Sequence, residues 1–575
     1  MLQASTGKLF TNHISHSNLL RGVLYTNMTI HVESEIETVF GRIYPTSMQR
    51  QPNVISCEIK ENIEYFGPGP GILYSNTIDI YLGDFADILA FSLNTVCTPD
   101  VELANRLLNE NPRPGSTPPK KLIKRLFEKD IHITSAEIDE LKKLTTELHG
   151  LQRKYYLKAI KAIRTYITAT HRLSENLDLA YTLLVMSIEA LVQDSGAYTS
   201  QWSDVEEGKR TKLEAILGAL DKETSENLKR VIVESEHLSL TKKFNHFILS
   251  HIPAAYFTHY ADKEENPIGK ADLESALSNL YGTRSKYVHE LKALPREFSH
   301  FSGTGEITLI DEKPILTIQG LTRLARAVIK EFIRKQKKVE HEPCDYNIDN
   351  PNIARMKLCP STWITRADGI GKDTCSMYFS GFVTLLDDFF YKYPAGTLYD
   401  VKNVIEKGFA IKENLSQAQR TSIVTLAALF NALIAERFRP IIELTKIDHK
   451  LSESPSIQVL IMAMVFGVDT GWPVTIQERE FKKYYKTRFK KTGFRLPHRL
   501  EAGLGLALAE KYRITGDHAM AIAQLNSTAE NFPKINAIRE YLKFHTAEKP
   551  ISWMSLIYPN LVKKEPLAHL ECDGL

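Results

Sequence analysis

The feature that most constrains the fold is a run of helical patterns between residues 135 and 337. Within it, "NLDLAYTLLVMSIEALV" is apolar on nearly every face, and Glu189 is the only charge between Leu179 and Val192. A helix with apolar side chains all round must be buried. The segments before and after it carry apolar residues at three- and four-residue steps, as amphipathic helices do. We therefore expect a helical bundle packed around this segment.

The 575 residues are too many for a single core, so we expect a multidomain, mainly α protein. "GVLYTNMTIHVES", "VISCEIK" and "GILYSNTIDIYLG" favour strands, and Phe85 to Leu108 favours a helix, so 1–108 predicts a β-rich N-terminal domain with a helical end. Residues 109–130 predict a linker and basic connector, 131–338 the bundle, 339–374 a second linker and 375–575 a C-terminal helical domain. Within the bundle, "GEITLIDEKPILTI" predicts a hairpin. In the C-terminal domain, Ala502 to Pro533 is similar to one tetratricopeptide helix pair.

The composition excludes several classes of protein. The net charge of +3 gives no global attraction to nucleic acid or membrane. The six cysteines are scattered, and no ligand cluster has metal-binding spacing, so we expect no zinc site, disulfide scaffold or cofactor. The N-terminal sequence does not read as a signal peptide, and 179–192 is too short to cross a bilayer. We expect a cytoplasmic protein without membrane contact.

The stretch "NLYGTRSKYVHELKAL", residues 279–294, places a charge where a core residue is expected. Leu280, Tyr287, Val288 and Leu291 predict an apolar helix stripe, and Arg284 falls on it. An arginine there must find an anion or reach water, because an unpaired buried charge is very costly. Glu189 poses the complementary problem in the apolar helix, so we expect the two to pair.

Two interpretations of this pair stay open. In the first interpretation the pair is a buried salt bridge that fixes helix register. In the second, Glu189 positions Arg284 to bind a phosphate while His289 transfers a proton. If the pair is buried, removing the Glu189 charge should cost roughly 3–5 kcal/mol. The R-x4-H spacing itself is uninformative, because Arg513 and His518 repeat it. Five residues also turn a helix by about 140°, so Arg284 and His289 do not share a face.

The setting of this motif resembles the HEPN superfamily, named for higher eukaryotes and prokaryotes nucleotide-binding, and within it the Apea-like domains. "YGTRSKYVHE" resembles the R-x4-H segment, and "LLVMSIEALVQ", "LEAILGAL", "FNHFI" and "PILTIQGLTRLARAVIKEFI" follow the order of that family's helices. The resemblance covers roughly residues 140–337. It implies a metal-independent ribonuclease that works as a homodimer or higher homo-oligomer, with Arg284 on the phosphate and His289 as acid or base; the pairing of Glu189 with Arg284 is our expectation from the buried charges. Ser285 stands where Asn is common.

A second basic segment bears on the substrate. "FKKYYKTRFKKTGFRLPHR", residues 481–499, contains eight Lys/Arg, no acid and interleaved aromatics, so bases could stack on the rings while cations track phosphates. The alternative is an amphipathic helix with core aromatics and solvated lysines. The candidate RNA-binding residues are Lys286, Lys482, Lys483, Lys486, Arg488, Lys490 and Lys491.

The sequence therefore predicts a metal-independent endoribonuclease, which the resemblance places in bacterial antiviral defence or a toxin-like system. Its expected partners are RNA, a second copy of the chain, and a protein that activates or inhibits it. The alternative function is a catalytically inactive HEPN module that dimerises and binds RNA or protein.

Overall fold

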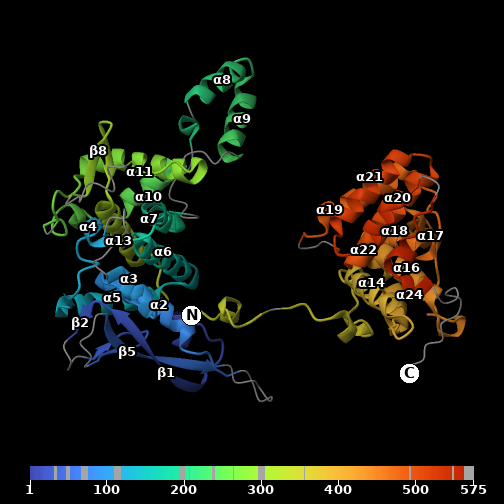
Figure 1. Ribbon diagram of the computed structural model, residues 1–575, viewed down its shortest axis with the longest axis horizontal. Helices are drawn as coiled ribbons and strands as arrows, with labels where there is room; N and C mark the ends of the chain where they lie inside the picture. The colour runs from blue at the N-terminus through green and yellow to red at the C-terminus, as the bar shows by residue number, and fades with distance from the viewer. Residues whose placement is uncertain are drawn as a thin grey trace. The chain divides into compact units, whose positions relative to one another are not determined.

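The computed structural model of the chain describes residues 1–30, 35–46, 52–65, 75–108, 118–192, 201–205, 207–235, 240–262, 264–295, 305–354, 356–490, 494–546 and 549–562. The chain divides into two compact units, Met1–Ala354 and Arg355–Leu575 (Figure 1). The division falls inside the predicted 339–374 linker. Both units are mainly helical, as the sequence predicted, and the sheets of the described residues all belong to the first. None of the described helices is long and apolar enough to cross a membrane.

The first unit begins with an antiparallel sheet of strand order β3-β4-β5-β1-β6. Its two long strands, β1 and β5, pair along their whole length with Gly22 opposite Cys57. Alternate β5 side chains are buried, which places one face of the sheet against the core. The strands are β1 (Ile14–Thr26), β3 (Ile36–Glu37), β4 (Arg42–Pro45), β5 (Asn53–Glu64) and β6 (Cys97–Thr98), and β2 (Met28–Thr29) pairs with β7 (Ile131–His132) in a separate parallel ribbon.

Helix α2 (Asp79–Leu93) corrects one prediction from the sequence. We expected a strand through "GILYSNTIDIYLG" and a helix only from Phe85, because that segment is rich in β-branched and aromatic residues; its residues 71–74 lie outside the described residues. The side chains of Leu82, Phe85, Ala86 and Leu89 are all buried, which is the three- and four-residue spacing of a helix. The helix lies close to the sheet over Gly22, where a Cβ atom would be 3.1 Å from Leu82 Cδ1.

The predicted bundle is present and surrounds α7 (Leu177–Val192), the apolar segment. The pattern over 135–172 forms two helices, not one, with the break at Leu151 and Gln152. The first starts with a capping box between Thr134 and Glu137. The other helices are α5 (Ser135–Gly150), α6 (Arg153–Arg172), α10 (Leu240–Ser250), α11 (Lys270–Glu290) and α13 (Ile318–Lys335), and β8 (Ile307–Ile310) with β9 (Lys313–Leu316) forms the predicted hairpin.

The β-rich region and the bundle share one hydrophobic core, so they are not the two separate domains that we expected. Polar contacts also join them. Gln3 Nε2 donates to the carbonyl of Leu151 at 2.8 Å, and Arg326 Nε donates to the carbonyl of Phe91 at 3.1 Å. Short helices α1 (Leu2–Ser5), α3 (Val101–Leu108) and α4 (Pro119–Leu122) complete this region, and α4 lies in the predicted connector.

Helices α8 (Glu207–Leu217) and α9 (Lys222–Ser235) were expected in the bundle but contribute little to its core. In Figure 1 they form a pair that stands away from the other helices of the first unit. Ile216, Leu228 and Val231 are exposed, and among the described side chains of the two helices only Leu217 is buried.

The second unit is helical and has its own core. The predicted tetratricopeptide-like pair is α20 and α21, joined at Gly516 (φ +84°), and the Asp517 carboxylate caps α21 by accepting from the backbone N–H of Met520. Gly505 lies against Thr528 across this pair. The helices are α14 (Cys375–Lys392), α15 (Lys402–Ala410), α16 (Gln417–Leu433), α17 (Lys446–Glu453), α18 (Ile457–Phe466), α19 (Val474–Thr487), α20 (His498–Ile514), α21 (His518–Asn531), α22 (Asn536–Lys543), α23 (Trp553–Ile557) and α24 (Pro559–Val562).

Candidate active site

The apolar stripe of α11 is buried along its first half and uncovered along its second. Leu273, Leu277 and Leu280 are fully buried, whereas Val288 is 42% and Leu291 79% exposed. The expectation that Val288 and Leu291 belong to the core is therefore wrong within one chain. Arg284 lies at the transition, where the helix leaves the core.

Glu189 on α7 and Arg284 on α11 form the predicted ion pair, with 2.8 Å between Glu189 Oε2 and Arg284 Nη2. Their side chains are 21% and 17% exposed, so the pair is neither fully buried nor on the open surface. Tyr281, one helical turn before Arg284, hydrogen-bonds to Glu189, and its ring centroid is 5.9 Å from Arg284 Cζ. The ring of Phe244 on α10 lies 5.3 Å from that of Tyr281. Three helices therefore fix the position of the guanidinium.

Tyr281 is a site residue that the sequence interpretation missed. The available signal was its position three residues before Arg284, which places the two on one helix face. The sequence interpretation considered only Arg284 and His289 as functional residues of this helix.

The electrostatics of the pair are unfavourable to the carboxylate. Burial raises the pKa of Glu189 above its usual value, and the attraction of Arg284 and the hydrogen bond from Tyr281 only partly offset this. Burial, helped by the negative Glu189, also raises the pKa of Tyr281. Arg284 Nε is buried and has no hydrogen-bond acceptor among the described residues. A buried donor without an acceptor is costly, so this arrangement of the guanidinium is held against a local penalty. The Arg284 side chain is still 17% exposed, so part of it remains accessible to an anion.

His289 lies in the last turn of α11 and is exposed. The helix is continuous from Lys270 to Glu290, so no local distortion removes the rotation of about 140° between Arg284 and His289. No hydrogen bond to a described residue orients the imidazole. Lys286, the candidate RNA-binding residue between them, is also exposed. The chain therefore brings Glu189 and Arg284 together and leaves His289 apart on the surface.

The second R-x4-H pair is a coincidence of sequence. Arg513 lies near the end of α20 and pairs with Glu510, with 2.7 Å between Arg513 Nη2 and Glu510 Oε1. His518 is the first residue of α21, beyond the turn at Gly516. The two residues belong to different helices, and the arginine is already occupied.

The basic segment 481–499 lies in the second unit and is mostly structural. Tyr484 is buried, and Phe481, Tyr485 and Phe494 pack against the core, so the prediction that these rings stack on bases is wrong. Helix α19 turns its apolar face inward, as the alternative interpretation described. The described lysines and Arg495 remain at the surface, whereas the guanidinium of Arg488 stacks on Tyr485 at 3.8 Å and that of Arg499 pairs with the buried Asp387 at 2.6 Å. Lys491 lies outside the described residues.

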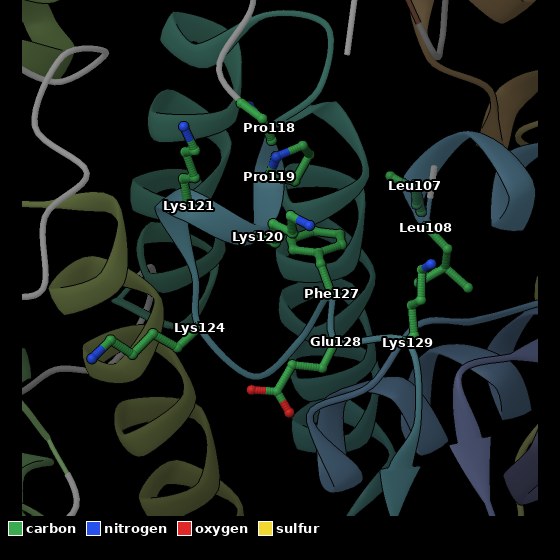
Figure 2. A pocket seen from close by; sticks show the side chains of 10 residues that line it. All are labelled: Leu107, Leu108, Pro118, Pro119, Lys120, Lys121, Lys124, Phe127, Glu128 and Lys129. Atoms are coloured by element: carbon green, nitrogen blue, oxygen red, sulfur yellow. The ribbon is translucent and has the colours of Figure 1, made fainter. Parts of the chain in front are cut away.

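A cavity of 550 Å³ in the first unit is lined by four lysines and by apolar residues (Figure 2). Pro118, Pro119 and Phe127 form one of its sides, and Leu108 lies opposite them. Figure 2 shows Lys124 pointing away from these apolar residues, and its ammonium pairs with Glu265. None of the predicted site residues lines this cavity.

Within the described residues, no three His, Cys, Asp or Glu side chains are grouped so that they could hold a metal ion. Comparisons with models of known protein families, with characterised proteins and with solved structures find no match to this chain.

Proposed function

We propose that the chain is a metal-independent endoribonuclease, in which Arg284 binds the scissile phosphate and His289 transfers protons. The observation that carries the proposal is the state of Arg284. Its guanidinium is held by Glu189 at 2.8 Å while its Nε donor is buried without an acceptor among the described residues. The Arg284 side chain is still 17% exposed, so a phosphate can approach the exposed part of the guanidinium, whose planar shape suits phosphate well.

The chemistry follows from these residues. The 2′-hydroxyl of RNA attacks the adjacent phosphorus as a base takes its proton, and the bond to the 5′-oxygen breaks as an acid protonates that oxygen. The products are a 2′,3′-cyclic phosphate and a 5′-hydroxyl. Arg284 balances the charge that develops on the non-bridging oxygens. Neutral imidazole is a suitable base, and imidazolium a suitable acid.

One chain supplies one exposed imidazole on a different helix face from Arg284, so we propose that the active unit is a homodimer. A two-fold axis presents the same patch twice and would bring His289 of a second copy to the phosphate held by Arg284. The exposed Val288 and Leu291 support this, because they lie beside His289 and give the same patch apolar area that a second copy could bury. The antiviral-defence or toxin-like role belongs to the same proposal through the HEPN resemblance.

The test is cleavage of a labelled single-stranded RNA by wild-type protein, His289→Ala and His518→Ala. Both histidines are exposed and five residues after an arginine, so His518→Ala is a matched control. Loss of an acid–base group should lower the cleavage rate by about 10²- to 10⁴-fold. His518→Ala should cleave at the wild-type rate. Equal rates for all three proteins would refute the role of His289.

The second candidate function is a catalytically inactive module that dimerises and binds RNA or protein. It is favoured by the His289 ring, which no described residue orients. Wild-type protein that binds RNA as a dimer, with no cleavage at any concentration, would establish this alternative.

A further inference from the structure

Phe489 is the one described aromatic of the 481–499 segment that stays open to solvent. It is 69% exposed, whereas Tyr484 is 3% exposed and the rings of Phe481, Tyr485 and Phe494 pack against the core. The segment therefore separates into rings that stabilise the fold and one ring that does not. A phenylalanine this exposed contributes nothing to the core of its own chain, so its ring is available to a ligand.

The lysines of the segment also fall into two groups, those that form ion pairs and those that do not. Lys482 pairs with Glu478 at 2.8 Å and Lys483 with Glu480 at 3.8 Å. Lys486 and Lys490 form no ion pair within the described residues. The unpaired positive charge therefore gathers beyond the middle of α19, in the part of the sequence that contains Phe489.

Two arginines flank the exposed ring. Arg488 Cζ lies 4.8 Å from the Phe489 ring centroid, and Arg495 Cζ lies 5.1 Å from it. Arg495 forms no ion pair within the described residues. Arg488 Nε is 3.7 Å from Glu501, and its Nε and Nη1 atoms are buried with no hydrogen-bond acceptor among the described residues. The exposed ring of Phe489 and the exposed guanidinium of Arg495 therefore offer planar surface and donors, while the largely buried Arg488 supports the ring.

These properties fit an unpaired nucleotide better than a peptide. A base stacks on an aromatic ring or a guanidinium plane, while its phosphate accepts hydrogen bonds from arginine. An acidic peptide would neutralise the cations but leave the exposed ring uncovered. We propose that Phe489, flanked by Arg488 and Arg495, is a base-stacking site for single-stranded RNA, with Lys486 and Lys490 contacting phosphates. That the nucleic acid is RNA rests on the proposed function; the site itself rests on the geometry of the second unit.

The test measures binding of the full chain to a fluorescent single-stranded RNA in which every 2′-hydroxyl is methylated. Such RNA cannot be cut by 2′-hydroxyl attack, so binding is measured whether or not the protein is a nuclease. Phe489→Ala should weaken binding by about 5- to 150-fold, the usual effect of losing one stacked base. Phe489→Trp should restore it. Phe544→Ala is the matched control, because Phe544 is 71% exposed in the same unit.

Salt dependence tests the phosphate contacts separately. Lys486→Gln with Lys490→Gln should reduce the slope of log affinity against log salt by about 1.4, because each contact with single-stranded nucleic acid contributes about 0.7. Lys543→Gln, which removes a lysine paired with Glu540 on α22, should leave the slope unchanged. Wild-type affinity in folded Phe489→Ala, or equal loss in Phe544→Ala, would overturn the proposal and assign the patch to a protein contact. Loss of RNA cleavage alone would refute the nuclease and leave this site standing.

Discussion

Glu189→Gln tests whether the pair with Arg284 exists for stability or for function. Gln keeps the size of the side chain and a hydrogen-bond acceptor for Arg284 and Tyr281, and removes only the charge. A fully buried pair should lose roughly 3–5 kcal/mol of unfolding free energy when one charge is removed. The structure changes that expectation, because burial raises the pKa of Glu189 despite the attraction of Arg284.

The expected magnitude follows from the geometry. Two unit charges 2.8 Å apart attract by about 6 kcal/mol at an effective dielectric constant of 20. The raised pKa means that desolvation of the carboxylate outweighs the attraction of Arg284, so Glu189 binds its proton more tightly in the folded protein than in the unfolded chain. Gln resembles that neutral form. We therefore expect the unfolding free energy of Glu189→Gln at neutral pH to lie between the wild-type value and about 1 kcal/mol above it.

The pH dependence has a definite sign. With its folded pKa above its unfolded pKa, Glu189 binds its proton more tightly in the folded protein, so wild-type stability falls as pH rises through this range. The difference between Glu189→Gln and wild type should therefore be near zero in acid and grow toward neutral pH. RNA cleavage should fall in the variant even so, because Arg284 loses the charge that positions it.

Hydrogen–deuterium exchange of peptides from α7 and α11 measures this stability locally, apart from the second unit. Glu274→Gln is the control, since Glu274 is exposed on α11. A loss above about 3 kcal/mol in Glu189→Gln would show that the pair anchors helix register. Unchanged stability together with unchanged cleavage would remove Glu189 from the site.

Three further predictions test other parts of the reasoning. Cleavage should persist in excess chelator and leave a 2′,3′-cyclic phosphate; a Mg²⁺-dependent activity that yields 5′-phosphates would indicate a different nuclease site. In mixtures of wild-type and His289→Ala chains, activity should fall as the square of the wild-type fraction, whereas a linear fall from a monomer would exclude a shared site. Gly505→Ala should destabilise the second unit by about 1–3 kcal/mol, because its Cβ would lie 2.5 Å from Thr528 Oγ1. Gly208→Ala, whose Cβ meets no atom within 4 Å, is its control in unfolding experiments.

The helices of the bundle could be predicted from the sequence because their periodicity is set by burial on one side. The same reasoning predicted the Glu189–Arg284 pair, because a charged side chain in an apolar helix needs an opposite charge as its partner. The prediction failed at 78–82, where β-branched and aromatic residues such as Ile78, Ile80 and Tyr81 suit a strand but also fit the start of a buried helix. Only the longer run through Leu89 decides between them.

The domain boundaries were harder to predict from the sequence, for a physical reason. Composition marks 109–121 as a linker, yet composition does not say whether the segments on either side bury surface against each other. Here the sheet, α2 and the bundle share one core. The burial of Tyr484 and the exposure of Phe489 could not be predicted from the sequence either, because both rings lie in the same basic segment. The two rings differ because Tyr484 lies within α19, which ends at Thr487, and Phe489 lies beyond it.

The two halves of α11 explain why the candidate site is incomplete in one chain. The first half is held in the core by Leu273, Leu277 and Leu280, which gives Arg284 a rigid base. The second half extends beyond that core and exposes Val288 and His289, and Leu291, directly after the end of the helix, is exposed as well. Apolar residues in these positions do not stabilise the single chain, so a surface that covers them would stabilise the assembly instead. Any such surface must also cover His289. In the homodimer that we propose, assembly and the placement of the imidazole are therefore one event, and an isolated chain lacks a proton-transfer group beside Arg284.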